Sequence, residues 1–146
     1  MLSNSILATV LLTVSMAAPA DSDITLTASP VTRELTLPEL AGPRDHYALR
    51  LVGISVAPGN PALFRVFVEL PTADRSTPAT SERYVGQASI LAGPSRVPKN
   101  VIMPLNWPQQ RKLSAGSKLR FTLVPLAGTS TSPIRIEKLE ITVTHP

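Results

Sequence analysis

The segment from Tyr47 to Gly93 constrains the fold of this chain more than any other part of it. Two apolar runs, YALRLVGISV and ALFRVFVELP, lie on either side of Pro58-Gly59-Asn60-Pro61, and a third, YVGQASILAG, follows a polar loop. Apolar residues that alternate with a period of two are typical of β-strands that bury one face, and Pro and Gly between such runs mark turns. The segment therefore predicts adjacent β-strands, and it contains no catalytic constellation.

The rest of the chain continues this pattern. Short alternating runs recur near Ile24, Leu35, Val101, Phe121 and Ile134, and the 15 prolines among 146 residues disfavour long helices. The segment after Asn106 has a proline where a helical turn begins and a glycine where it ends. We therefore predict an all-β fold, an antiparallel β-sandwich of about seven or eight strands with one short helical turn near residues 107–115.

Two strands change phase along their length. In the run that starts at Tyr47, the leucines before Gly53 and the aliphatic residues after it fall on opposite sides of a regular strand. One extra residue would return them all to the core face, so we predict a β-bulge at Gly53. The last strand changes phase in the same way, which predicts a second slip near Glu137-Lys138.

The N-terminus has the pattern of a targeting segment. Residues 6–18 form an apolar run too short to span a bilayer, and Ala18-Pro19-Ala20 fits the small-x-small rule for signal cleavage. We expect a signal peptide over 1–20, export to the periplasm or outside the cell, and no stable membrane anchor after cleavage. Residues 21–146 would form a single domain. No Lys or Arg precedes the run, and the alternative is a first core element.

Composition argues against several classes of function. There is no cysteine, which excludes disulfides and thiolate metal sites. The net charge of +4 comes from scattered Lys and Arg residues, with no basic run interleaved with aromatics, so we expect no nucleic-acid binding and assign these charges to solvated strand faces.

The sequence contains no motif of an enzyme. His46 and His145 could share a zinc or copper ion only if the C-terminal tail folded back onto the Asp45-His46 loop, and we expect ordinary surface histidines instead. No Gly-x-Ser-x-Gly elbow or phosphate-binding glycine loop is present, and the ten acidic residues are scattered along the chain, so surface salt bridges explain them better than a pair of catalytic carboxylates does. We therefore expect no enzyme activity, no catalytic or metal-binding residues and no cofactor.

The strand before Pro71 has apolar residues on both faces. Its expected core face holds Phe64, Val66, Val68 and Leu70. Leu63 and Phe67 lie on the other face. One interpretation is that an arm or loop of the same chain, such as the segment before Tyr47, covers Phe67. The alternative is that this apolar position is exposed and contacts a partner. Trp107 also has two interpretations: its indole packs over the end of the sandwich, or it is an exposed anchor that binds a protein or a sugar. Leu63, Phe67 and Trp107 are thus the residues of a possible partner face. The polar loop 72–83 is expected to be mobile.

Several runs together resemble a known family. They are LRLVGISV (49–56), FRVFVELP (64–71), YVGQASILAG (84–93), KLRFTLVPL (118–126) and IRIEKLEI (134–141). Their order is similar to that in the C-terminal β-sandwich domain of tyrosinases and polyphenol oxidases, the type-3 copper enzymes, from about Val31 to Val143. Glu69 stands where the family usually has Asn, and the helical copper domain with its six histidine ligands is missing.

The resemblance implies a function by contact with a second protein. In that family the C-terminal domain covers the entrance to the dicopper site and keeps the enzyme latent, a role that here would require a separately encoded dicopper oxidase as partner. The plugging residue of the family lies in a variable loop and maps to no position of this chain. The first hypothesis is therefore an exported, non-catalytic accessory or shielding module that binds protein. The alternative is a stand-alone structural sandwich, or one that binds carbohydrate or a cell surface.

Overall fold

The computed structural model describes residues 20–40, 42–91, 98–105, 115–127 and 133–145. Over these residues it contains eight strands in two four-stranded sheets, and every pairing is antiparallel. The strands are β1 (Ala20–Leu26), β2 (Val31–Thr36), β3 (His46–Ser55), β4 (Pro61–Val68), β5 (Tyr84–Leu91), β6 (Lys99–Pro104), β7 (Lys118–Ala127) and β8 (Ile134–Thr144). The predicted antiparallel β-sandwich is confirmed, and the helical turn predicted near 107–115 lies outside the described residues.

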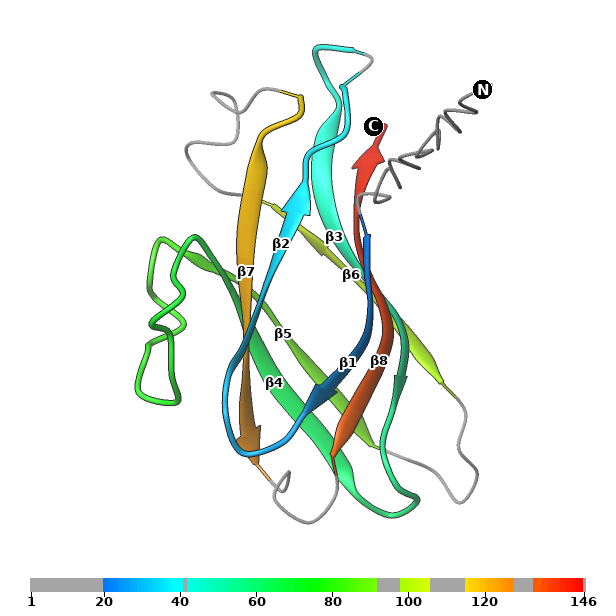
Figure 1. The fold of residues 1–146 in the computed structure, drawn as a ribbon, viewed down its shortest axis with the longest axis vertical. Helices are drawn as coiled ribbons and strands as arrows, with labels where there is room; N and C mark the ends of the chain where they lie inside the picture. The colour runs from blue at the N-terminus through cyan, green and yellow to red at the C-terminus, as the bar shows by residue number, and fades with distance from the viewer. Residues whose placement is uncertain (1–19, 41, 92–97, 106–114, 128–132, 146) are drawn as a thin grey trace, which may run out of the picture.

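The two sheets have the strand orders β1-β8-β3-β6 and β2-β7-β4-β5, and Figure 1 shows them as two layers. Only β4 and β5 are consecutive in the chain and also neighbours in one sheet, while the other connections pass between the sheets. Strand β6 is an edge strand, and Pro104 fits this position because proline donates no hydrogen bond to a neighbouring strand.

The core lies between the inward faces of the two sheets. Its fully buried residues include Ile24, Leu26, Leu35, Leu49, Leu51, Phe64, Val66, Phe121, Leu123, Ile136 and Leu139. Phe64, Val66 and Val68 belong to this core, with at most 1% of each residue exposed, so the predicted core face of β4 is confirmed over these three positions.

Leu70, the fourth residue assigned to that face, was predicted wrongly. Strand β4 ends at Val68, and Glu69 has a φ of 52°, which turns the chain so that Leu70 packs with Phe67 instead. Arg120 holds Glu69 in this left-handed conformation: the Glu69 amide donates to the Arg120 carbonyl over 2.8 Å, and Glu69 Oε1 accepts from the Arg120 amide over 2.7 Å. The period of two therefore breaks one residue earlier than the sequence indicates.

Both predicted slips are present, and the register places them opposite each other. The β3–β6 register shifts between Leu51 and Ile54, and Gly53 has a φ of 67°. On β8, Glu137 and Lys138 are both exposed between two buried residues. The β3–β8 pairs on either side, Val52 with Lys138 and Ile54 with Ile136, place Gly53 opposite Glu137. Because both strands change phase at the same level, both keep their apolar residues in the core.

Replacing Gly53 with Ala is expected to destabilise the fold by about 1–2 kcal/mol or more, because side chains disfavour its positive φ. A Cβ atom there would also overlap the Glu137 carboxylate, which would have to move. Gly59→Ala is the matched control, since Gly59 has a φ of 81° but has no neighbouring atom within 4 Å of an added Cβ. Denaturant unfolding of both variants, alone and combined with Glu137→Ala, measures the two effects separately. Equal losses of unfolding free energy for the two glycine variants would show that the close approach of Glu137 to residue 53 does not contribute to the effect.

Candidate functional site

The structure describes two of the three residues of the possible partner face. Phe67 is completely buried, Leu63 is half-buried, and Trp107 lies outside the described residues. The interpretation that the chain itself covers Phe67 therefore applies. The cover is the loop that follows β4, not the segment before Tyr47 that we had suggested.

A second, smaller apolar cluster attaches this loop to the outer face of the sheet β2-β7-β4-β5. Phe67 packs there with Ala73 and Val124, and the partly buried Leu70, Tyr84 and Leu126 surround them. The Phe67 and Tyr84 rings meet edge to face, with centroids 5.8 Å apart. Figure 1 shows this loop (green) projecting from the side of the sandwich that the sheet β2-β7-β4-β5 forms.

Hydrogen bonds connect residues of loop 72–83 to one another and to the sheet, and the expected mobility of the loop stays a prediction. Asp74 Oδ1 accepts from the Ser76 amide over 2.8 Å and also from the Ser76 hydroxyl. Thr77 Oγ1 accepts from the Asp74 amide over 2.9 Å. Arg75 Nε donates to the Pro125 carbonyl on β7 over 3.2 Å, which ties the loop to the sheet. Short polar side chains that bond the backbone two or three residues away stabilise such turns.

The hydrogen bonds that Asp74 accepts predict a pH-dependent loop. The Ser76 side chain first, and then the Ser76 amide, lower the pKa of Asp74 below its ordinary value. A carboxylate with a lowered pKa in the folded state contributes stability above its unfolded pKa, which is about 3.9, and loses that contribution as the pH falls through the folded value. We expect the Ser76 amide resonance to titrate in NMR spectra with a midpoint below about pH 3.9. Asp74→Asn should abolish this titration, and a midpoint at or above the ordinary value would contradict the assignment.

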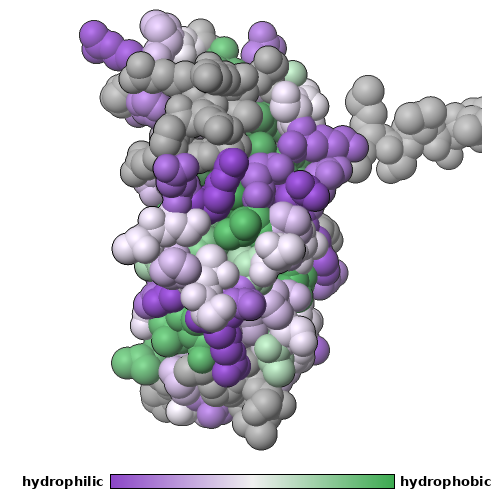
Figure 2. All heavy atoms as spheres, turned by 90° about the vertical axis from the view of Figure 1, so that its left-hand side faces the viewer, coloured by the Kyte–Doolittle hydropathy of each residue, from purple (hydrophilic) through white to green (hydrophobic). Residues whose placement is uncertain are grey.

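Part of the outer face remains apolar and uncovered. Leu91, at the end of β5, is 82% exposed, and it pairs with Pro61 two residues from Leu63 on β4. By strand alternation Leu63 and Leu91 are diagonal neighbours on the outward side of the sheet. Figure 2 shows the side of the molecule that carries the loop, where small apolar areas lie among hydrophilic residues. Sequence analysis found Leu63 but missed Leu91, although alternation along YVGQASIL places it outward.

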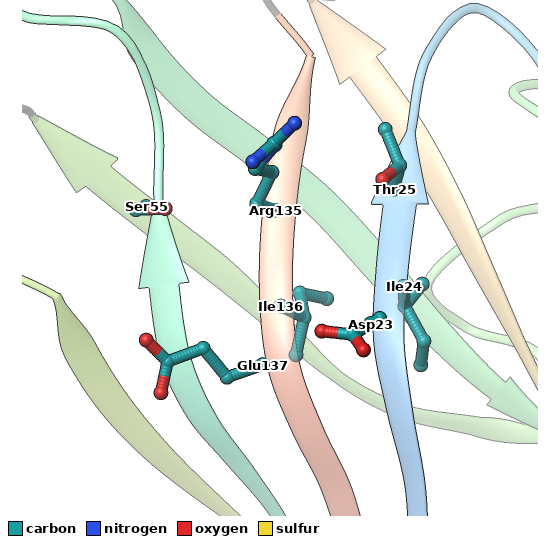
Figure 3. A pocket seen from close by; sticks show the side chains of 7 residues that line it. All are labelled: Asp23, Ile24, Thr25, Ser55, Arg135, Ile136 and Glu137. Carbon is teal, nitrogen blue, oxygen red and sulfur yellow. The ribbon is translucent and has the colours of Figure 1, made fainter.

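The other sheet has a polar pocket of about 390 Å³ on its outer face. Its polar side chains come from three neighbouring strands: Asp23 and Thr25 from β1, Ser55 from β3, and Arg135 and Glu137 from β8 (Figure 3). Sequence analysis assigned Arg135, with the other Lys and Arg residues, to solvated strand faces and did not connect it with Asp23 or Glu137. They meet only through strand pairing, which no local motif reveals.

Both histidines are exposed, as expected of surface histidines, but the C-terminal tail does return to the Asp45-His46 loop. His145 Nδ1 lies 2.7 Å from Asp45 Oδ1, and Asp45 Oδ2 accepts from the Gly42 amide over 2.8 Å. His46 pairs with Thr144 in the β3–β8 ladder. One imidazole beside one carboxylate fixes the tail to the loop. Across the described ranges, no three His, Cys, Asp or Glu side chains converge as a metal site would need.

In the part of the chain that the structure describes, no helix is long and apolar enough to cross a membrane.

Comparison with known proteins identifies the architecture. No protein-family model matches the sequence, and no curated protein is similar to it. Among solved structures, recombinant latent aurone synthase, a polyphenol oxidase, superposes with a TM-score of 0.63 at 15% identity, over 83% of this chain and 26% of that chain. Latent apple tyrosinase superposes with a TM-score of 0.63 at 18% identity, over 84% of this chain and 27% of that one. A carbohydrate-binding module solved with calcium and xylotriose gives a TM-score of 0.44 at 10% identity, over 86% of this chain and 90% of that chain.

The chain thus spans about a quarter of the length of these enzymes. The resemblance to the C-terminal β-sandwich domain of the tyrosinase and polyphenol oxidase family, stated from the sequence, is confirmed at the level of the fold.

Proposed function

We propose that this chain is an exported, non-catalytic module that binds another exported protein and shields it, and that a separately encoded dicopper oxidase is the first partner to test. The observation that carries the proposal is the fold likeness to polyphenol oxidases, which covers most of this chain but only 26% and 27% of theirs. Most of each of those enzymes lies outside the part that this chain matches, which supports a role for this domain in contact with a second protein.

The uncovered apolar residues supply a contact surface for such a partner. Leu91 is the last residue of the edge strand β5, and Leu63 lies on the neighbouring strand β4. Strand β5 contains no charged residue and no proline. Edge strands without such residues are open to contact with other chains. The other three edge strands carry charged residues, proline or both: Asp21 and Asp23 in β1, Arg33 and Glu34 in β2, and Lys99 and Pro104 in β6. The proposal therefore places the partner against β5 and the outward side of β4.

The test is a binding and inhibition assay with a purified dicopper oxidase domain from the same organism. We expect the protein to co-elute with that domain in size-exclusion chromatography and to slow its oxidation of a diphenol. Leu91→Lys should weaken both effects by about tenfold or more, because it places a charge in the apolar contact.

Ile102→Lys is the matched control. Ile102 is 57% exposed but lies on β6, in the other sheet, so this variant should bind as the wild type does. Absence of co-elution and inhibition with the wild-type protein would reject the oxidase partner. Binding to polysaccharide or to whole cells in its place would favour the stand-alone sandwich.

Export is tested separately. Cleavage after Ala20 would give a secreted chain that begins at Asp21, and intact-mass measurement of the protein from the growth medium or periplasm identifies its first residue. A soluble cytosolic species that keeps Met1 would contradict export.

A further inference from the structure

We propose that the polar pocket on the outer face of β1, β8 and β3 binds a small basic amino acid of the lysine type. This proposal does not depend on the proposed protein-binding function, because the pocket and the Leu63–Leu91 surface lie on different sheets. The pocket volume of about 390 Å³ falls in the range of small-molecule sites, roughly 300–1,000 Å³.

The polar side chains of the pocket form two rows across the strands. In the first row Arg135 is paired directly with Thr25 on one side and with Ser55 on the other. Directly paired residues on one face of a sheet have Cβ atoms about 5 Å apart. A guanidinium between two hydroxyl groups is suited to a carboxylate, because guanidinium binds carboxylate through two parallel hydrogen bonds and hydroxyls can donate to it.

The second row is anionic and lies two residues further along the strands. The β1–β8 register on either side places Asp23 opposite Glu137, and Gly53 completes the row on β3. Figure 3 shows the Asp23 side chain pointing from β1 toward β8 and the Glu137 side chain extending toward β3. Glu137 can lie there because Gly53 has no Cβ atom, which would otherwise overlap the carboxylate. Two carboxylates in neighbouring positions repel each other unless a cation lies between or beside them.

None of the pocket charges is neutralised by the described part of the protein. Asp23, Arg135 and Glu137 have no ion pair with any described residue, whereas the neighbouring Glu140 contacts both Arg50 (3.2 Å) and Lys138 (2.8 Å). The three free charges sum to −1, with a cation at one end and two anions at the other. A free basic amino acid has the complementary set, two ammonium groups and one carboxylate.

The spacing of the rows fits such a ligand. Two residues of a strand span roughly 6.6 Å, which is close to the separation between the carboxylate and the side-chain ammonium of an extended lysine. The lysine carboxylate would meet Arg135, and its side-chain ammonium would meet Glu137. Its α-ammonium, on the carbon that bears the carboxylate, would lie between the two rows and face Asp23. The site is open to solvent, so salt should weaken binding.

The test is an NMR titration of the protein with L-lysine at low ionic strength. We expect shifts of the pocket amides that saturate at millimolar lysine and that weaken as salt is added. L-lysinamide lacks the carboxylate, and Nα-acetyl-L-lysine lacks the α-ammonium and mimics a lysine at the end of a peptide. Each should bind about tenfold more weakly, since each loses one charge-assisted hydrogen-bonding group. Equal binding of Nα-acetyl-L-lysine would overturn the free amino acid as the ligand in favour of a peptide end.

Protein variants test the assignment of each charge. Arg135→Gln should remove the difference between lysine and lysinamide, and Glu137→Gln should weaken lysine binding about tenfold or more. Glu34→Gln is the matched control, because it removes one exposed carboxylate at the edge of the other sheet and should leave binding unchanged. All three changes are at solvent-facing positions, and circular dichroism checks that each variant is folded. No saturable binding of L-lysine, or binding unaffected by Arg135→Gln and Glu137→Gln, would overturn the proposal.

Discussion

Replacing Val66 with Asp is expected to prevent folding. Val66 is fully buried in the middle of β4, between its partners Gly86 on β5 and Leu123 on β7, and its side chain faces the core. A carboxylate at this position would have no cation in the aliphatic core and would lose its hydration. An unpaired buried charge costs several kcal/mol, against a total stability of about 5–15 kcal/mol for a domain of this kind.

Ser89→Asp is the matched control for this change. It introduces the same charge on the neighbouring strand β5, but at an exposed position, and should alter the free energy of unfolding by no more than about 0.5 kcal/mol. Circular dichroism and a thermal melt of both variants make the comparison. A folded Val66→Asp protein with near wild-type stability would mean that the side chain of Val66 faces solvent and that β4 has its faces reversed. That result would contradict the β-sandwich assignment.

The fold could be predicted from the sequence where burial alone determines the pattern. Each strand of the sandwich buries one face, so a period of two identified β4, and departures from that period located the slips at Gly53 and Glu137. Prediction failed at Glu69, where the backbone turns against the ordinary preference of its residue type. The tyrosinase and polyphenol oxidase family, which the sequence resembles, usually has asparagine at that position. Asparagine tolerates a positive φ better than most residues, so this difference could have indicated the turn.

The candidate sites were less accessible to sequence analysis because they depend on pairing between distant strands. The pocket combines Asp23, Ser55 and Arg135, which the β1–β8 and β3–β8 registers bring together. Either register shifted by one residue would turn one set of side chains to the opposite face, and the sequence does not state the register. A cover over Phe67 was predicted, but the wrong segment was named for a related reason: a loop rich in polar residues gave no sign of the few apolar contacts that hold it.

Replacing Phe67 with Ser is expected to destabilise the protein by about 3–5 kcal/mol, and to lower the melting temperature by about 10 °C or more. Phe67 is completely buried, although it lies on the outward side of β4, because Ala73 and Tyr84 of the following segment pack against it. A serine would leave a cavity under the loop and a hydroxyl without a partner there. The loop 72–83 should then become sensitive to limited proteolysis, while the core cluster around Phe64 remains intact.

Leu63→Ser separates this effect from a general loss of apolar surface. Leu63 lies on the same strand and the same face, but it is only half-buried and is not part of the cluster under the loop. Its replacement should therefore cost about 1 kcal/mol or less in stability, because little apolar area is removed from the interior. A denaturant melt of both variants decides the matter. If Phe67→Ser were as mild as Leu63→Ser while binding to a partner protein weakened, Phe67 would belong to an exposed contact face, and loop 72–83 would not cover it in solution.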